Sequence, residues 1–182
     1  MKKIFVACLI MTNCYSATCE SPPLNYLTVK AKKTLHNQIY LTLATVTPQH
    51  LPWNTPVYTA FNQQYQFFWM SRKLAQHSKN LQINHQVFAV AYDSTLPHGE
   101  GFGVYLQGRG RVLNDNIEIR RAIKIMGRRL GKTRFPNPAN FQRSNARRVY
   151  EFTPQHVWVN YVKNMHGQML DGRVEITKCL RP

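Results

Sequence analysis

Residues 65–90 hold the side chains in this chain whose types and spacing are best suited to chemistry. An aromatic run is followed by a short basic segment that contains serines, and then by a second apolar run. The basic segment supplies hydroxyl and cationic donors of the kind that bind phosphate oxygens: Ser71, Arg72, Lys73, His77, Ser78 and Lys79. A helix that begins near Leu74 would add free backbone N–H groups and the positive end of its dipole. The segment therefore predicts an anion-binding turn.

An aromatic wall lies directly upstream of this turn, at Phe67, Phe68 and Trp69. A ligand held at this place could carry both a phosphate and a flat ring system, and flavin mononucleotide (FMN) fits that description. The alternative for Trp69 is simple core packing, which is common for large aromatic residues. For Ser78 and Lys79 the alternative is an ordinary solvated helix face.

Five segments, in this order, resemble motifs of the FMN-binding split-barrel proteins, the pyridoxamine 5′-phosphate oxidase-related family. They are Tyr40–Val46 (YLTLATV), LPWNTPVYTAF from Leu51, FFWMS, HSKNL and GVYLQGRGRV from Gly103. The resemblance covers about residues 24–161. It implies a homodimer with FMN bound non-covalently at the subunit interface, and an oxidoreductase that acts on a small molecule of unknown identity. True pyridoxamine phosphate oxidases hold their substrate through an Arg-x-His pattern after a Trp, and its absence after Trp158 argues against that reaction.

The resemblance also implies individual cofactor contacts. The HSKNL string matches the turn that contacts the phosphate, and residues 54–57 match the strand beside the flavin ring, on which Val57 and Trp69 would pack. Met70 and Ser71 match a position near the ring or ribityl chain, and Trp158 matches an aromatic that approaches from the far end of the chain. The implied cofactor-binding residues are Asn54, Thr55, Val57, Trp69, Met70, Ser71, His77, Ser78, Lys79 and Trp158. The sequence indicates no catalytic acid, base or nucleophile, and no metal site.

The elements that must position these residues predict a mainly β protein of the α+β type, a six-stranded antiparallel split β-barrel with flanking helices. Ser21 and Pro22 are a good helix start, and Asp115 with Glu118 forms a plausible capping box for a later helix. A third helix is expected over residues 74–83. Strands are expected over residues 40–47, 53–61, 65–71, 86–93 and 103–113, and a closing pair over 147–152 and 156–162 around Thr153 and Pro154.

Three regions are expected along the chain: an N-terminal segment (1–21), the FMN-binding split-barrel domain (22–163) and a C-terminal tail (164–182). Lys2 and Lys3 precede the short apolar run 4–11, which is the layout of a secretory signal peptide. Alternatively, translation starts at Met11. We expect a cytoplasmic protein, or an exported one if residues 1–17 are a working signal. No segment predicts a membrane-spanning helix.

Cysteines indicate no disulfide framework in the body of the domain. Cys8, Cys14 and Cys19 lie in the N-terminal segment and Cys179 lies in the tail. If the mature chain is exported and retains Cys19, that residue could pair with Cys179 in an oxidising compartment.

The charge leaves two alternative functions open. The 24 Lys and Arg against 8 Asp and Glu give a formal net charge of +16, which favours anionic partners. Ten basic residues and no acidic one lie within residues 120–148, so a nucleic-acid-binding surface is an alternative, ranked below flavin because aromatics are not interleaved. Haem binding or degradation is the other alternative, with His166 as axial ligand and Met165 or Met169 as a second. A flexible tail is the simpler interpretation of those three residues.

Overall fold

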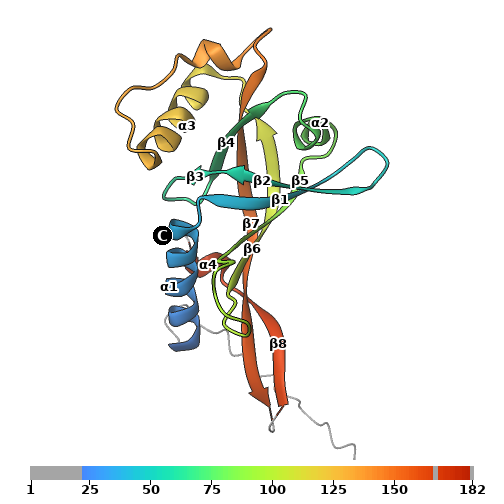
Figure 1. The fold of residues 1–182 in the computed structure, drawn as a ribbon, viewed down its shortest axis with the longest axis vertical. Helices are drawn as coiled ribbons and strands as arrows, with labels where there is room; N and C mark the ends of the chain where they lie inside the picture. Colours follow the sequence, from blue (N-terminus) through green and yellow to red (C-terminus); the bar gives the residue numbers. More distant parts are fainter. Residues whose placement is uncertain (1–21, 166–167, 181–182) are drawn as a thin grey trace, which may run out of the picture.

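A computed structural model describes residues 22–165 and 168–180 of the chain. Within them, eight strands form one sheet (Figure 1). The strands are β1 (Tyr40–Val46), β2 (Pro52–Tyr58), β3 (Ala60–Phe61), β4 (Phe67–Arg72), β5 (Gln86–Tyr92), β6 (Gly103–Val112), β7 (Arg147–Met165) and β8 (Gln168–Glu175). The helices are α1 (Pro22–Asn37), α2 (Gln76–Ile83), α3 (Asn116–Arg129) and α4 (Thr177–Leu180), with a 3₁₀ turn η1 (Pro138–Phe141).

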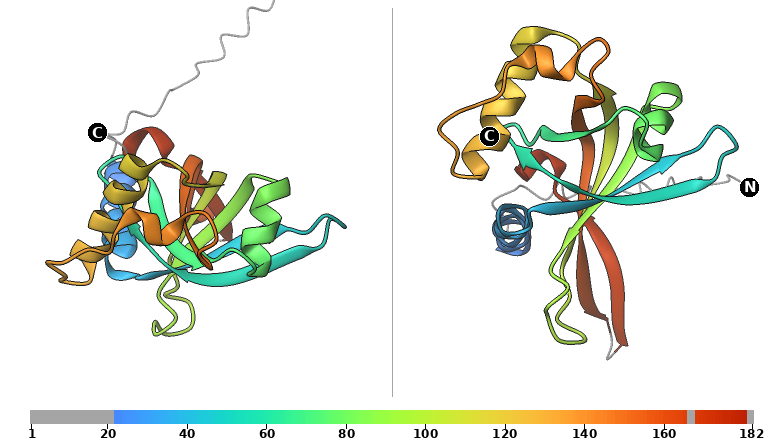
Figure 2. Two further views of the ribbon diagram at one scale, coloured as in Figure 1. Left: turned by 90° about the horizontal axis from the view of Figure 1, so that it is seen from above. Right: turned by 45° about the horizontal axis from the view of Figure 1, so that its top comes forward.

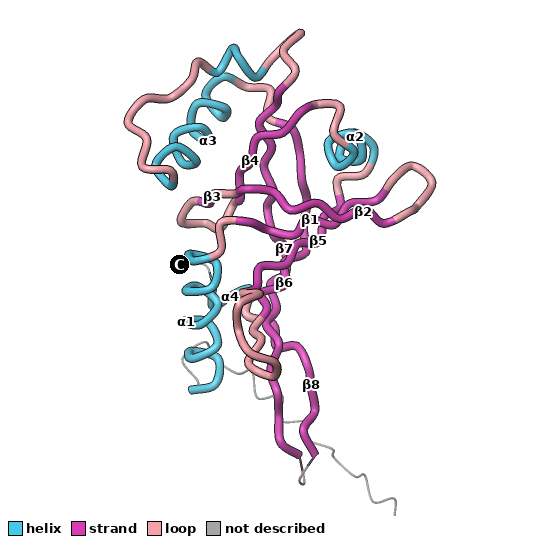
Figure 3. The backbone as a smooth tube through the Cα atoms, in the orientation of Figure 1, coloured by secondary structure: helices cyan, strands magenta, loops and turns pink. Residues whose placement is uncertain are grey.

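The sheet is antiparallel at every described pairing and follows the order β2-β1-β5-β6-β7-β4-β3, with β8 paired to β7. It curls into a half-barrel, so that β2 and β4 contact each other although several strands separate them in the sheet (Figure 2). The β7–β8 hairpin projects away from the half-barrel (Figure 3). The predicted split-barrel fold with flanking helices is confirmed, and the described sheet has eight strands rather than six.

Helices cover the half-barrel on different sides. α2 packs on β1, β2 and β6, α3 packs on β3, β4 and β7, and α1 packs on β5, β6 and α4. Leu27, Ala31 and Leu35 form the buried stripe of α1 at helical spacing. The capping box predicted at the start of α3 is confirmed in part. Asp115 accepts hydrogen bonds from the backbone N–H groups of residues 117 and 118, whereas the Glu118 carboxylate accepts from Arg111 instead of from the N-cap backbone.

The two closing strands expected around Thr153 and Pro154 are one continuous strand, β7. Pro154 has no backbone N–H, and a proline inside a sheet is tolerated at a bulge. The β6–β7 register shifts between Gln107 and Gly108, directly opposite Pro154. A Cβ on Gly108 would lie 2.1 Å from the Thr153 carbonyl oxygen, so the glycine allows β6 and β7 to approach at this bulge.

Two further expectations on secondary structure are wrong. The strand expected over residues 53–61 is divided at Thr59, whose N–H donates to the Ile39 carbonyl, and the short β3 then pairs with β4 instead of β1. The expected flexible tail contains β8 and α4, with Ile176 and Leu180 buried in the core. The domain boundaries stay a prediction, and so does the N-terminal segment, because residues 1–21 lie outside the described part of the chain.

Two hydrophobic clusters hold the fold together. The larger fills the half-barrel and includes Phe67, Trp69 and Phe152. The smaller lies under α3 and includes Phe68 and Ile123. Alternate residues of β4 therefore face different clusters, as the two-residue period of a strand requires.

Candidate cofactor-binding site

The predicted anion-binding turn lies where β4 ends and α2 begins. We call residues 71–79 the α2 turn. The Lys73 N–H donates to the Ala146 carbonyl and the Ala75 N–H donates to the Arg72 carbonyl, which fixes the backbone between strand and helix. Ala75 is the N-cap residue and supplies no side-chain acceptor. The first backbone N–H groups of α2 are therefore left without a side-chain cap, and such groups bind anions well.

His77 and Ser71 are paired inside this turn. The His77 Nε2 and the Ser71 Oγ lie 2.9 Å apart, and the His77 side chain is buried. Burial lowers the pKa of His77, because it penalises the charged imidazolium. At neutral pH the imidazole is therefore uncharged and orients the Ser71 hydroxyl rather than adding a positive charge.

Ser78 is the most deeply buried polar residue of the α2 turn. Its hydroxyl makes no hydrogen bond of ordinary geometry within the described part of the chain. The Tyr150 phenol is the group nearest to hydrogen-bonding it: burial raises the pKa of Tyr150, while the contact with Ser78 and the charge of Arg148 lower it. A buried hydroxyl without a well-formed hydrogen bond costs up to about 1–3 kcal/mol, and a ligand atom that completes it would remove this cost.

Trp69 packs against Tyr150 in the core of the half-barrel. Its ring stacks on Tyr150 at 5.3 Å between centroids and 16° between planes, and its indole Nε1 has no hydrogen-bond partner in the described residues. Trp69 and Val57 both belong to the core cluster of the half-barrel. The core encloses both side chains in the single chain, and their role of packing on a flavin ring stays a prediction.

Asn80 is a positioning residue that the sequence reasoning did not single out. It is buried, donates to the Thr45 Oγ1 at 2.9 Å and accepts from the Gln76 Nε2 at 2.8 Å. Thr45 donates in turn to the Trp53 carbonyl at 3.4 Å. This series of hydrogen bonds ties α2 to β1 and β2. The place of Asn80 in the HSKNL string is the sequence feature that could have identified it.

The strand predicted to run beside the ring, β2, has a free edge. The Thr47 N–H donates to the Leu51 carbonyl and the Thr59 N–H donates to the Ile39 carbonyl, which identifies the hydrogen-bonded pairs of the β1–β2 hairpin. Along β2 these pairs alternate with pairs whose N–H and C=O groups point away from β1. Asn54 belongs to the second kind, so its backbone groups face the edge that no described strand covers.

The side chains of β2 differ in what they offer. Asn54 is exposed, and Thr55 is half-buried and accepts a hydrogen bond from the Trp53 Nε1 at 3.0 Å. Pro56 lies at the free edge, where its missing N–H breaks no ladder bond. Asn54 and Thr55 thus remain available to a ligand at this edge.

Met70 and Trp158 are not part of the α2 turn. Met70 follows Trp69 but faces the other side of β4, in a cavity of about 350 Å³ beside α3. Trp158 lies in β7 on the outer face of the sheet, stacked on His156 at 5.4 Å. One chain therefore brings together Ser71, His77, Ser78 and the exposed Lys79, and it leaves Met70 and Trp158 on other surfaces.

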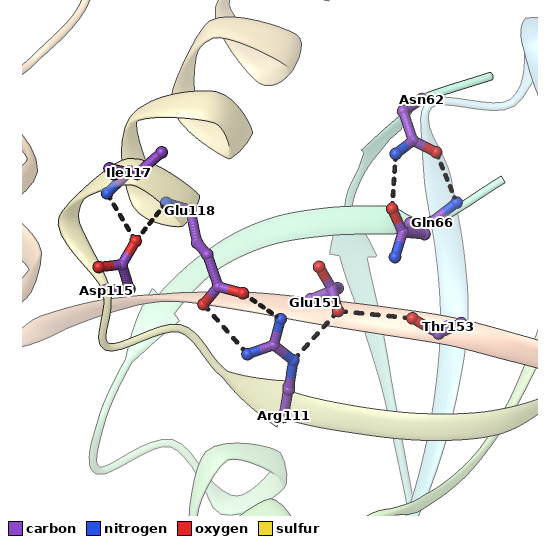
Figure 4. Close-up of polar contacts among 8 residues, drawn as sticks. All are labelled: Asn62, Gln66, Arg111, Asp115, Ile117, Glu118, Glu151 and Thr153. Atoms are coloured by element: carbon purple, nitrogen blue, oxygen red, sulfur yellow. Dashed lines mark hydrogen bonds and ion pairs between the residues drawn. The ribbon is translucent and has the colours of Figure 1, made fainter. Parts of the chain in front are cut away.

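Most of the few carboxylates are committed to structural contacts. Arg111 joins Glu118 at 2.7 Å and Glu151 at 3.1 Å, and Asp115 caps α3 (Figure 4). These contacts raise the pKa of Arg111, with the hydrogen bond to Glu118 as the largest cause. The exposed Lys79 side chain has neither an ion pair nor a hydrogen bond with a described residue. Its charge is free to meet an anion at the α2 turn.

The residues considered for haem and metal binding can be placed only in part. His166 lies outside the described residues, and Met165 and Met169 lie in the β7–β8 hairpin. Within residues 22–165 and 168–180 no group of three or more His, Cys, Asp and Glu is arranged to hold a metal ion. No helix in the same ranges is long and apolar enough to cross a bilayer. Cys179 is disulfide-bonded, whereas its predicted pairing with Cys19 stays a prediction.

The buried His77 makes the stability of the protein sensitive to acid. The unfolded chain takes up its proton near pH ~6.5, while the folded chain takes it up only at lower pH, because the pKa of His77 is lowered. The contribution of the neutral, buried His77 to the free energy of unfolding is thus present above pH ~6.5. It is lost as the pH falls through the folded pKa of His77. In urea unfolding at pH 7.5 and 5.5, the parent should lose more free energy of unfolding than His77→Gln. The exposed His98→Gln is the control, and equal losses in the parent and His77→Gln would contradict the assignment.

Comparison with known proteins identifies the family and the fold of the chain. The sequence pattern described as pyridoxamine 5′-phosphate oxidase matches residues 27–161, which is more than half of the chain. A comparison with curated protein sequences found no match.

Three solved structures show the same fold at low identity. HutZ, described as the heme storage protein of Vibrio cholerae, has a TM-score of 0.59 at 20% identity, over 71% of this chain and 90% of that one. A heme binding protein of Mycobacterium smegmatis has a TM-score of 0.61 at 15% identity, over 85% of this chain and 59% of that one. Campylobacter jejuni ChuZ has a TM-score of 0.61 at 10% identity, over 81% of this chain and 59% of that one. From the matched sequence pattern, with this fold, we conclude that the chain belongs to the pyridoxamine 5′-phosphate oxidase family.

Proposed function

We propose that the protein is an FMN-binding flavoprotein in which the α2 turn holds the phosphate and the free edge of β2 holds the pyrimidine edge of the ring. The Ser78 hydroxyl, buried in the first turn of α2 without a hydrogen bond of ordinary geometry, is the observation that carries the proposal. Ser71, oriented by His77, and the exposed Lys79 would complete a set of phosphate donors. The uncapped N–H groups of α2 add to this set.

A bound flavin would supply hydride or electron transfer, which makes an oxidoreductase the natural function class. The protein would bind and orient it. Backbone groups of Asn54 would hydrogen-bond the ring edge, and Asn80 would keep β2 and α2 at a fixed separation. The redox substrate is a small molecule that these residues do not identify.

We further propose that the working unit is a homodimer and that each site takes ring contacts from both chains. Phe88, Val90, Tyr105 and Trp158 are neighbours on the outer face of the sheet and are only partly buried in one chain. A row of partly exposed aromatic and aliphatic side chains on a sheet is typical of an interaction surface. If a second copy covered this face, its Trp158 could approach a flavin that the α2 turn of the first copy holds.

Haem is the second candidate ligand, and its binding or storage by HutZ and by the M. smegmatis protein favours it. Haem would need an axial ligand such as His166, with Met165 or Met169 as a second. The α2 turn has no role in that proposal. The two candidates therefore predict different residues to matter.

Lys79→Ala should weaken FMN binding about tenfold to hundredfold, because it removes a charge-assisted hydrogen bond of about 1.5–3 kcal/mol. Riboflavin lacks the phosphate, so its affinity should be unchanged. The measurement is quenching of flavin fluorescence during titration, and Lys33→Ala on α1 is the matched control. If FMN passes through a desalting column while haem is retained with a sharp Soret band that His166→Ala abolishes, haem is the ligand and the FMN proposal fails.

A further inference from the structure

A second concave surface lies between α3, the end of α1 and the turn that follows β3. Two cavities of about 640 and 510 Å³ adjoin there and share His36, Phe61, Asn62 and Gln63. We call these two cavities the α3 cleft. Each is within the size range of small-molecule sites. None of the residues that line either cavity belongs to the α2 turn or to β2.

The α3 cleft is lined by cations and by no acidic residue. Arg121, Arg128 and Arg129 line it from α3, and Lys32 lines it from α1. Arg121 and Arg128 are exposed and seven residues apart, which places them on one face of the helix. Neither guanidinium group makes an ion pair or hydrogen bond with any residue that the structure describes. Two arginines are thus held at the cleft with their donors unused.

Arg129 is different, because the fold fixes it in place. Its Nη2 donates to the His36 and Gln38 carbonyls, each at 2.9 Å, and its guanidinium lies 5.6 Å from the Phe61 ring centroid. Burial lowers the pKa of Arg129, yet an arginine remains charged at neutral pH. The hydrogen bonds that the structure describes for this guanidinium use Nη2 alone, which leaves Nε and Nη1 for an anionic ligand.

Flat rings and amides complete the lining. Phe61 stacks on Tyr65 at 5.2 Å between centroids, and the exposed His36 meets Phe61 edge to face at 5.1 Å. Aromatic platforms of this kind hold nucleobases by stacking. Gln63 and Gln64 are exposed at the turn, and amide groups can donate to and accept from the edges of a base.

We propose that the α3 cleft is a binding site for a nucleoside phosphate, either free or as part of a single strand. Arg121 and Arg128 bind the phosphate oxygens, Arg129 supplies a fixed positive charge, and the base lies against Phe61 and His36. This site goes beyond the proposed flavin site and shares none of its residues. It also gives the basic segment 120–148 a role that a merely solvated helix face would not have.

The test is isothermal titration of the FMN-treated, full-length protein with ADP, with adenosine and inorganic phosphate as partial ligands, and with a short single-stranded RNA. Arg121→Ala and Arg128→Ala should each weaken ADP about tenfold or more, because each removes a charge-assisted hydrogen bond. Arg120→Ala is the matched control, because Arg120 is exposed on α3 but does not line the cleft. Lys79→Ala should leave ADP binding unchanged, which separates this site from the flavin site.

The two sources of the ligand give different patterns. A free nucleotide is the ligand if ADP binds more tightly than the RNA on a molar basis, and a single strand is the ligand if the RNA binds more tightly. In either case Arg121→Ala and Arg128→Ala must lower the affinity for the ligand that binds more tightly. Equal weakening by Arg120→Ala would mean diffuse charge attraction, and the proposal would then be wrong. It would also be wrong if neither ligand bound at millimolar concentration, or if Lys79→Ala abolished ADP binding.

Discussion

Replacing Trp69 with alanine should lower the free energy of unfolding by about 3–5 kcal/mol, the usual cost of removing a large aromatic from a core. Trp69 is 1% exposed and fills the half-barrel beside Phe67 and Phe152. It also stacks on Tyr150, which adds about 0.5–1.5 kcal/mol beyond the buried area. Such a loss is a large part of the total stability of a domain of this size.

Urea unfolding followed by circular dichroism measures this effect. Trp69→Phe keeps an aromatic ring in place and should cost clearly less than Trp69→Ala. Trp53→Ala is the matched control, since Trp53 is 45% exposed and should lose little stability. Similar losses for Trp53→Ala and Trp69→Ala would contradict the placement of Trp69 in the core. Any Trp69 variant that folds should also bind FMN less tightly, because Tyr150 and Ser78 lose their support.

Gly108→Ala should destabilise the protein by about 3 kcal/mol or more, because the new methyl group meets backbone atoms that cannot move aside. The added Cβ would lie 2.1 Å from the Thr153 carbonyl oxygen and 2.7 Å from the Pro154 Cα. This is the bulge at which β6 and β7 change register. The substitution would thus separate the two strands that form the centre of the sheet.

Thermal unfolding distinguishes this steric effect from a general preference for glycine. Gly101→Ala is the control, because a Cβ there meets no atom within 4 Å and the residue lies in a loop. We expect Gly101→Ala to unfold near the temperature of the parent and Gly108→Ala to unfold far below it. A Gly108→Ala protein as stable as the parent would show that the bulge adapts, contrary to the tight approach in the structure.

The two proposed sites each hold part of the positive charge of the protein. The α2 turn combines a buried, uncharged His77 with the cationic residues Arg72, Lys73 and Lys79 at the start of a helix, so it suits a phosphate group. The α3 cleft combines three arginines with aromatic rings and is lined by no acidic residue, so it suits a phosphate attached to a base. The net charge of +16 favours anionic partners for the whole chain, and parts of that charge lie at two sites with different chemistry.

Long, regular elements were predictable from the sequence because their signals are local. The alternation of apolar residues located β1, β5 and β6, and the helical spacing of Leu27, Ala31 and Leu35 located α1. Asp115 marked the start of α3 correctly through its own side-chain cap. The division at Thr59 and the continuity of β7 were not predictable in this way. Each depends on a partner far along the chain, the Ile39 carbonyl in the first case and Gly108 in the second.

Part of the candidate site was also predictable. The residue types of Ser71, His77 and Ser78 named a phosphate-binding turn, and the structure places all three together around the start of α2. Val57 and Trp69 were assigned to ring packing, but both side chains lie in the core. The sequence pattern of a strand predicts that its side chains alternate between the two faces of the sheet. The pattern does not predict which of these faces another element covers.

The sequence by itself determined the family, the order of the main elements and the residue types gathered in the α2 turn, because these follow from short motifs and local periodicity. Only the tertiary structure decided that Asn80 ties α2 to β1, that Ser78 is buried without a hydrogen bond of ordinary geometry, and that Arg129 is fixed against the end of α1. The α3 cleft and the bulge belong to this second group. Each depends on contacts between segments far apart in the chain, and burial and packing arise from those contacts rather than from the residues alone.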